Sequence, residues 1–341
     1  KDVNYHDIGF QYYLYSGAGL KIKKCFLMCI DNTYVRKGEI EPRKLFKKID
    51  ITKEIKTTYS KTIEANMTEM IKTIADDTCP EIGIGAHCSD PYECPLIDKC
   101  WSFVPERNVF LLYRKKKLPM ALIKDDILEL TQIPESLELN EKNQIQVDCE
   151  KTGKPYIDRT KIKKFLDKIQ YPAYYMDFET FASAIPIFDD SKPYQQIPFQ
   201  FSVHVVKKKG ASPEHYSFLA DGPNDPRPNF MAELKEVMGT KGSVIAFNAG
   251  FEMGRLKECA KVLPIYKKWV ESIEERIIDL LQPFRAFAYY HPQQDGSCSI
   301  KKVLPVLTGK SYADMEIGDG GTASSEYFRI TFTEDNKDKD K

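Results

Sequence analysis

The 341-residue chain has 50 basic and 50 acidic side chains, so its net charge is zero, and hydrophobic residues make up 42% of it. These values exclude a small disulfide-stapled module and a charged tail protein, and they favour about two ordinary folded domains. The sequence has no apolar run of roughly 18 residues, and no secretory signal follows Lys1. We therefore expect a cytoplasmic protein without a membrane partner.

Near the N-terminus, the segment Gln11-Tyr12-Tyr13-Leu14-Tyr15 fits the pattern Gln-x-x-x-Tyr. It resembles the late helical motif of RecB-like nucleases of the PD-(D/E)XK class. In that class the Gln and Tyr contact nucleic acid or steady the acids of the metal site. The resemblance implies that Gln11 and Tyr15 bind nucleic acid and that the catalytic acids precede Lys1. The alternative is an aromatic face of a core helix or strand.

Nine cysteines, an odd number without an export signal, indicate thiols or metal ligands. Cys88, Cys94 and Cys100 are separated by two intervals of five residues that contain Pro turns, so they can converge on one metal centre. Cys79, or a cysteine that precedes Lys1, can supply a fourth thiolate. The cluster resembles that of RecB-like nucleases of the Cas4 and AddB sort, which implies a [4Fe-4S] cluster. A Zn²⁺ site that uses Cys79 or His87 is the alternative.

Charge and composition divide the chain. Residues 1–117 hold 20 basic and 16 acidic side chains, a charge of +4, which leaves −4 for the rest. We assign 1–117 to the C-terminal part of the RecB/Cas4-like α/β domain with the cysteine cluster, and 333–341 to a charged loop or tail. Residues 118–170 are interpreted as a polar connector with helices at Lys124–Leu130 and Thr160–Ile169.

From Tyr171 onward, short apolar runs that predict strands alternate with helical patterns, which indicates an α/β domain over 171–332. The expected strands are Tyr171–Phe178, Ile197–Val206, His215–Leu219 and Ser243–Phe247. The expected helices are Asn229–Met238 and Glu252–Val262.

The first of these strands ends in two carboxylates, Asp177 and Glu179. Side chains alternate along a strand, so both point the same way, about 7 Å apart. Two like charges in this position repel each other unless a cation lies between them. Mg²⁺ or Mn²⁺ suits carboxylate oxygens. The alternative is that Asp177 caps the following turn and Glu179 is merely exposed.

A second acidic motif follows the buried strand Ser243–Phe247. Gly250 marks a turn, Asn248 can cap the next helix, and Glu252 falls in the first helical turn, where the dipole favours a carboxylate. A capping role alone is the alternative explanation for Glu252.

Taken in order, these two motifs resemble those of RNase H-like exonucleases of the DEDD class, which implies that the α/β domain is built on a mixed sheet. Arg276–Leu281 and Ser299–Pro305 resemble the strand and helix that follow in that class. The resemblance implies phosphodiester hydrolysis with two metal ions held by four carboxylates. By position, Asp177 would bridge both ions, Glu179 would bind the ion that generates the nucleophile, and Glu252 would stand where the class more often has Asp.

The chain departs from that class at its end. The third motif, Tyr-x-x-x-Asp or His-x-x-x-x-Asp, is not visible, and the acids considered for it after Glu252 are Asp279, Asp314 and Asp319. We expect the helix with the fourth acid to lie beyond Lys341. The chain as given would then be catalytically impaired, because it lacks the fourth acid.

The sequence therefore predicts a metal-dependent nuclease with 3′–5′ exonuclease-like activity on DNA or RNA, DNA being favoured, in DNA repair or defence. Its cofactors would be two Mg²⁺ or Mn²⁺ ions, and Gln196, Asn248 and Lys301 would also contact nucleic acid. The order of the motifs over residues 5–332 resembles that of an uncharacterised bacterial family, described only as a domain of unknown function. In that family a RecB/Cas4-like nuclease precedes a DEDD-type domain. The rival is a non-catalytic nucleic-acid-binding or scaffold module with a degenerate site.

Overall fold

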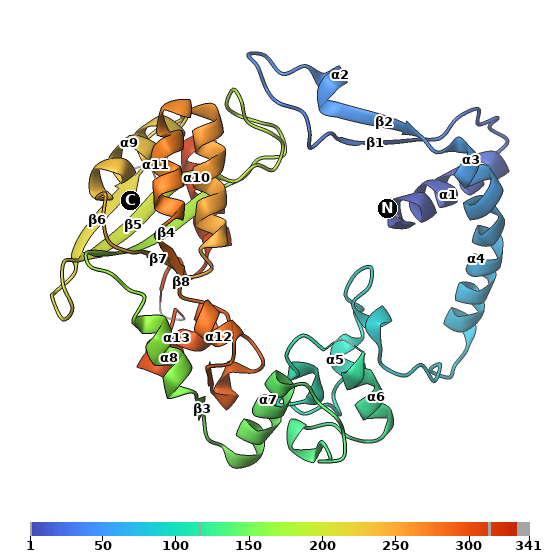
Figure 1. Ribbon diagram of the computed structural model, residues 1–341. Helices are drawn as coiled ribbons and strands as arrows, with labels where there is room; N and C mark the ends of the chain where they lie inside the picture. Colours follow the sequence, from blue (N-terminus) through green and yellow to red (C-terminus); the bar gives the residue numbers. More distant parts are fainter. Residues whose placement is uncertain (1, 116, 313–314, 333–341) are drawn as a thin grey trace. The chain divides into compact units, whose positions relative to one another are not determined.

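The computed structural model describes residues 2–115, 117–312 and 315–332, in two compact units (Figure 1). Unit 1 contains residues 1–103 and 184–193, and unit 2 contains 104–183 and 194–341. The boundary thus falls at 103/104 rather than at 117. The tail assigned to 333–341 lies outside the described residues.

Unit 1 is built from α-helices and one antiparallel pair of strands, β1 and β2. Its elements are α1 (Asp2–Gly17), β1 (Phe26–Ile30), α2 (Pro42–Leu45), β2 (Phe46–Asp50), α3 (Thr52–Glu54), a π-helical turn (Ile55–Tyr59), α4 (Ser60–Ala75), a 3-10 turn (Ala86–Cys88) and α5 (Ile97–Cys100). Its core gathers Cys25, Ile51 and Ile55. A Cβ on Gly9 of α1 would lie 2.9 Å from the Cβ of Tyr59, so glycine permits this close helix approach.

The loop 184–193 belongs to unit 1 although the strands on either side of it belong to unit 2. Arg36 donates to the carbonyl oxygens of Pro186, at 3.1 Å, and of Ile187. The N–H of Gly38 donates to the Asp189 carboxylate at 2.7 Å. These bonds attach the loop to residues 36–38 of unit 1.

Residues 104–150 contain a buried apolar cluster, which extends from before residue 117 into the segment interpreted as a polar connector. The buried side chains in it are Val109, Leu112, Leu122, Leu130, Ile133 and Val147. Its elements are a 3-10 turn (Val109–Leu111), α6 (Leu118–Lys124), a second 3-10 turn (Leu130–Gln132) and α7 (Glu141–Thr152). The helix expected at Lys124–Leu130 does not form. Helix α6 ends at Lys124, and Asp126 then takes a left-handed backbone (φ 58°), which a continuing helix does not allow.

The remainder of unit 2 is organised by a five-stranded mixed sheet with strand order β6-β5-β4-β7-β8. β5 runs antiparallel to both β4 and β6, whereas β4, β7 and β8 are parallel. The strands are β4 (Ala173–Phe181), β5 (Ile197–Val206), β6 (Glu214–Leu219), β7 (Val244–Ala246) and β8 (Ile277–Asp279). The predicted α/β class with a mixed sheet is therefore confirmed.

The helices of this part form one core with the sheet, in which Met176 and Phe178 of β4 meet Leu234 and Leu256. Strand alternation directs Asp177 and Glu179 to the opposite face of β4. The elements are α8 (Arg159–Leu166), α9 (Arg227–Val237), α10 (Gly250–Val262), a 3-10 turn (Pro264–Tyr266), α11 (Lys267–Glu274), α12 (Gln282–Arg285), a 3-10 turn (Pro292–Gln294), α13 (Ile300–Thr308) and α14 (Gly320–Phe332). A small antiparallel pair joins β3 (Tyr156–Ile157) to β9 (Tyr289–Tyr290).

Helix α14 occupies a stretch whose glycines gave no helical prediction. Its Tyr327 stacks on Phe199 of β5, with ring centroids 3.9 Å apart, and packs against Phe181 of β4. These aromatic contacts hold α14 beside the end of β4.

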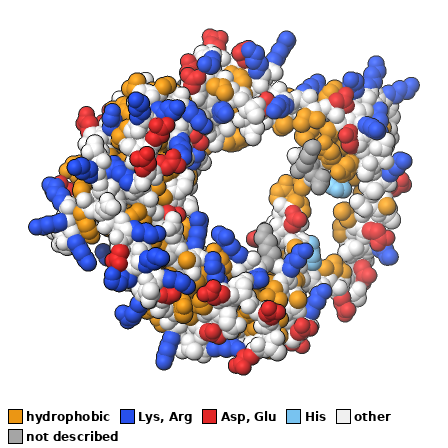
Figure 2. All heavy atoms as spheres, in the orientation of Figure 1, with side chains coloured by type: hydrophobic (Ala, Val, Ile, Leu, Met, Phe, Trp, Pro, Cys, Tyr) orange, Lys and Arg blue, Asp and Glu red, His pale blue; other side chains and the backbone are white. Residues whose placement is uncertain are grey.

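Among the described residues, no helix is both long and apolar enough to cross a bilayer. On the face seen in Figure 2, acidic and basic side chains are interspersed.

Candidate acidic site

The two acidic motifs meet at one edge of the sheet. β4 and β7 are parallel neighbours, with Tyr174 opposite Val244, so their carboxyl ends lie side by side. A pocket of about 480 Å³ opens there. It is lined by Asp177, Glu179 and Glu252, together with Gln196, Asn248 and the first turn of α14. The structure therefore brings together the three carboxylates that the sequence singled out.

Glu252 is the most buried of the three acids, with only 3% of its surface exposed. Its Oε2 has no hydrogen-bond partner among the described residues. Burial raises the pKa of Glu252 to about 7, and the negative charges of Asp177 and Asp279 add to the rise. A capping role alone does not explain this residue, because a buried carboxylate with one unpartnered oxygen favours a proton or a cation.

Asp177 keeps a solvent-exposed surface at the mouth of the pocket, whereas Glu179 is half-buried. Partial desolvation raises the pKa of Asp177. The pKa of Glu179 is raised first by desolvation and then by the negative charges of Asp177 and Asp319. Within the described part of the chain, no Lys or Arg forms an ion pair with these two acids or with Glu252. The pocket thus concentrates negative charge.

Helix α14 begins against the acids through Asp319 and Gly320. The Asp319 carboxylate accepts the N–H groups of Gly321, at 2.9 Å, and Thr322, at 3.0 Å, and the Thr322 hydroxyl at 2.8 Å. It is therefore a helix cap, and these bonds lower its pKa. A Cβ on Gly320 would lie 2.9 Å from Oε2 of Glu179. Glycine at this position lets the helix begin close to the carboxylate.

Asp279 also has a structural role. Its Oδ1 accepts the N–H groups of Asn248, at 2.9 Å, and Leu281, at 3.0 Å. It thereby fixes the loop after β7 to the loop after β8. The remaining candidate acid, Asp314, lies outside the described residues.

Asn248 does not cap α10, so that prediction is wrong. Its backbone is left-handed (φ 70°), which makes Asn248, not Gly250, the turn residue. The cap position is Ala249, without a side-chain hydrogen bond. The side chain of Asn248 instead accepts a hydrogen bond from Arg285 at 3.2 Å.

Gln196, Lys301 and Tyr312 lie around the same acids. Gln196 lines the pocket, and its Oε1 accepts the Thr180 hydroxyl at 2.6 Å. Lys301 is exposed, and its charge helps to lower the pKa of Asp319. The charge of Asp177 contributes to a raised pKa of Tyr312, behind desolvation. Tyr312 and the first turn of α14 had no sequence signal beyond a tyrosine and glycines in a loop-like stretch.

In unit 1, Gln11 and Tyr15 lie on α1, so the Gln-x-x-x-Tyr segment is helical. Gln11 donates to Asp7 at 3.2 Å, and Tyr15 is exposed. Neither fact tests a contact with nucleic acid.

The four cysteines of the cluster differ in exposure. Cys88 is buried, Cys94 is intermediate, and Cys79 and Cys100 are exposed. The Sγ of Cys88 accepts the N–H of Gly85 at 3.4 Å, and the carbonyl of Cys88 accepts the N–H of Cys94 at 2.8 Å. The loop therefore folds Cys94 back toward Cys88.

In the part of the chain that the structure describes, no three His, Cys, Asp or Glu side chains are already gathered at ligand distances. The acidic pocket nevertheless fits a hard divalent cation by its chemistry. It combines three carboxylates of raised pKa with a buried oxygen that has no partner.

Fold and site together define a mixed α/β domain with an acidic pocket at the carboxyl ends of two parallel strands. Residues 174–299, from β4 to the cap of α13, match the family model described as Domain of unknown function (DUF2779). The expected resemblance to an uncharacterised family of bacterial proteins is confirmed to that extent.

Two curated relatives come from mycoplasmas. The chain is 29% identical over 182 residues to "Uncharacterized protein MG366 homolog" of Mycoplasma pneumoniae, covering 48% of this chain and 27% of that protein. It is 32% identical over 165 residues to "Uncharacterized protein MG366" of Mycoplasma genitalium, covering 43% and 24%. The chain thus matches about a quarter of the length of each relative. No solved structure matches it.

Proposed function

We propose that unit 2 carries an RNase H-like, metal-dependent nuclease site that hydrolyses phosphodiester bonds in DNA or RNA. The observation that carries the proposal is Oε2 of Glu252, which is buried and unpartnered in a pocket shared with Asp177 and Glu179. The strand order β6-β5-β4-β7-β8, with only β5 reversed, supports the RNase H-like interpretation.

The electrostatics of the pocket favour a divalent cation. Each of the three acids has a raised pKa, which means that the protein alone disfavours their charged forms. Asp177, Glu179 and Glu252 would hold Mg²⁺ or Mn²⁺. When bound, two such ions supply an activated water and stabilise the charge that develops on the leaving oxygen.

The chain's own groups prepare this site. Asp279 fixes the loop that carries Asn248, and the hydrogen bond from Thr180 orients Gln196 toward the pocket. Asp177 lies at the exposed mouth, where an extended strand can reach it. Gln196 and Asn248 offer polar groups for the strand, as predicted for nucleic-acid contacts.

The direct test is cleavage of an end-labelled single strand by the full-length protein in Mg²⁺ or Mn²⁺, because the fourth acid is expected beyond Lys341. Asp177→Ala and Glu252→Gln are expected to abolish cleavage. Asp125→Ala and Glu275→Gln are matched controls, because both acids are exposed and lie outside the pocket. Cleavage that is equal in Asp177→Ala and Asp125→Ala would refute the proposal.

A second candidate function is non-catalytic binding of nucleic acid. It is favoured by one observation: among the described residues, Asp279 and Asp319 are both engaged as hydrogen-bond acceptors for loops and caps, so neither is free as a fourth ligand. Binding of the strand without cleavage in either metal, with Mn²⁺ uptake retained, would support this candidate.

For unit 1, we propose that Cys88, Cys94 and Cys100, with Cys79, bind a [4Fe-4S] cluster, or Zn²⁺ as the alternative, in a RecB/Cas4-like segment. The folded-back loop between Cys88 and Cys94 supports the proposal. Anaerobic purification followed by absorption spectroscopy and metal analysis distinguishes the two. A colourless protein with stoichiometric zinc excludes the cluster.

A further inference from the structure

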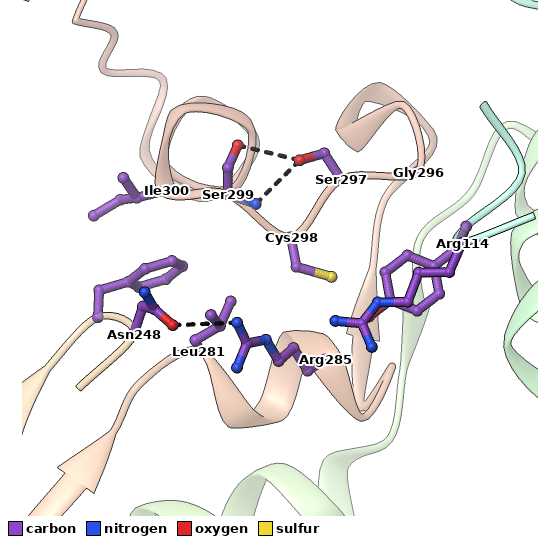
Figure 3. A pocket seen from close by; sticks show the side chains of 11 residues that line it. Arg114, Asn248, Leu281, Arg285, Gly296, Ser297, Cys298, Ser299 and Ile300 are labelled. Carbon is purple, nitrogen blue, oxygen red and sulfur yellow. Dashed lines mark hydrogen bonds between the residues drawn. The ribbon is translucent and has the colours of Figure 1, made fainter. Parts of the chain in front are cut away.

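A second pocket, of about 550 Å³, lies next to the acidic one. Figure 3 shows the residues that line it. Phe247 and Asn248 line both pockets, so the two share a wall. The second pocket is formed by the loop before α6, the end of α12 and the turn that leads into α13. Its polar lining is cationic and neutral, in contrast to the three carboxylates next to it.

Two arginines, Arg114 and Arg285, line this pocket (Figure 3). Both are exposed, and neither forms an ion pair with a carboxylate in the described ranges. The Arg285 guanidinium donates to Asn248 through one nitrogen only, at 3.2 Å. Its other N–H groups remain available. The charges of Arg114, Arg285 and Lys142 all reach Cys298, where they oppose the rise in its pKa caused by burial. Lys142 does not line the pocket, and its Nζ donates to the backbone carbonyl of Arg285 at 2.7 Å.

The start of α13 adds neutral donors. The backbone N–H groups of Ile300 and Lys301 are the first two of the helix, and they have no acceptor within the described residues. Ser297 and Ser299 both line the pocket, and their hydroxyls hydrogen-bond each other at 3.2 Å. Backbone N–H groups at a helix start together with arginines are the donors that proteins use for phosphate groups.

We propose that this pocket binds a backbone phosphate of the nucleic-acid strand, next to the phosphodiester that lies among Asp177, Glu179 and Glu252. The inference rests on the proposed function and adds a substrate-positioning site to it. Arg114 and Arg285 bind this phosphate. Asn248, which lines both pockets, lies between the phosphate position here and the phosphodiester position among the acids. The opposite charges of the two pockets then fix where the strand lies, because the arginines attract its phosphate without metal and the acids repel it unless metal is bound.

The test measures binding of a fluorescein-labelled single-stranded oligonucleotide by anisotropy in EDTA, so that the acidic pocket is not engaged. The variants are Arg114→Gln, Arg285→Gln and the double variant. Arg159→Gln is the matched control, because Arg159 is an exposed arginine of unit 2 at the start of α8, outside both pockets. Circular dichroism and thermal unfolding verify that all four variants are folded.

We expect each pocket variant to bind several-fold more weakly than Arg159→Gln. The slope of log affinity against log salt should become shallower by about 0.7 for each phosphate that the variant no longer neutralises. Equal affinities and slopes for the double variant and Arg159→Gln would overturn the inference.

Two further strands, one with a 5′-phosphate and one with a 3′-phosphate, test the source of the phosphate. Internal-backbone binding predicts that the affinity of the arginine variants falls by the same factor with all three strands. A weakening confined to one terminally phosphorylated strand would overturn the backbone assignment in favour of a terminal phosphate. Because the binding is measured without metal, these results stand apart from the Asp177→Ala cleavage assay, whose failure would instead remove the nuclease proposal.

Discussion

Glu179 of β4 and Gly320 of α14 lie so close that a Cβ on Gly320 would come within 2.9 Å of the Glu179 carboxylate. The two residues are far apart in the sequence. The first turn of α14 therefore forms one wall of the acidic pocket and limits where Glu179 can lie.

The first prediction concerns that contact. Gly320→Ala is expected to displace the Glu179 carboxylate, which is the movable end of a long side chain, and to weaken Mn²⁺ binding several-fold. Stability should change by less than about 1 kcal/mol, because a helix start gains from losing a glycine. Isothermal titration with Mn²⁺ and thermal unfolding separate the two effects.

Gly254→Ala is the control for this experiment. A Cβ there meets nothing within 4 Å, so the variant should be stabilised by roughly 0.5–1 kcal/mol. Its Mn²⁺ affinity should be unchanged. Equal affinities for Gly320→Ala and Gly254→Ala would contradict a role for the α14 start in the pocket.

The second prediction is a pH dependence of stability without divalent ions. The pKa of Glu252 is about 7 in the folded protein, against 4.5 for an unperturbed glutamate. Between these values the unfolded chain binds fewer protons, so the free energy of unfolding should fall as pH rises from about 4.5 to about 7 and then level off. The loss at Glu252 amounts to at most roughly 3 kcal/mol. Asp177 and Glu179 act in the same direction.

The variant Glu252→Gln tests the predicted direction of this pH dependence. It cannot ionise, so in EDTA at pH 8 it should be more stable than the parent chain, and its stability should vary less across this pH window. Urea unfolding at pH 5 and pH 8 measures both. A parent chain that gains stability between these pH values, with Glu252→Gln following it, would contradict the assignment of a buried, unpartnered carboxylate.

The third prediction is stabilisation by metal. A ligand that binds only the folded state at 100 times its Kd raises the free energy of unfolding by about 2.7 kcal/mol. Saturating Mn²⁺ should therefore raise the Tm of the parent chain, and EDTA should reverse the rise. Asp177→Asn should lose most of this shift, whereas the control Asp125→Asn should keep it. Identical shifts in the two variants would place the Mn²⁺ elsewhere.

The fourth prediction concerns the aromatic contact that positions α14. Tyr327 is buried and stacks on Phe199, so Tyr327→Ala should cost about 3 kcal/mol of stability. Because α14 then loses its place beside β4, Mn²⁺ affinity should fall as well. Tyr194→Ala, at a residue that is 59% exposed, should change stability by less than about 0.5 kcal/mol. Denaturant unfolding compares the two.

Local sequence was sufficient where the pattern of a segment decides its structure. Alternation and apolar runs predicted β5 with the same bounds as in the structure, and β4, β6 and β7 within a few residues. The acids near the ends of β4 and β7 were also predicted to belong to the same metal site. Both results rest on periodicities that a chain shows locally.

Local sequence failed where a distant contact decides. No helix was predicted over residues 320–332, but Asp319 caps a helix there and Tyr327 anchors it on β4 and β5. Residues 118–150 looked polar, but the few apolar side chains among them share a core with Val109 and Leu112. Asn248 was predicted to cap α10 because asparagine is a common helix cap, but its side chain accepts a hydrogen bond from Arg285 instead.

By itself, the sequence determined the α/β character of the second unit and the identity of its three acids, because strand alternation and the spacing of charged residues are properties of short segments. Only the tertiary structure decided that Glu252 is buried without a partner, that α14 closes the pocket, and that a cationic pocket lies across Asn248 from the acids. These features arise from burial and from contacts between residues far apart in the chain, which set the desolvation and the electrostatic field that no local pattern encodes.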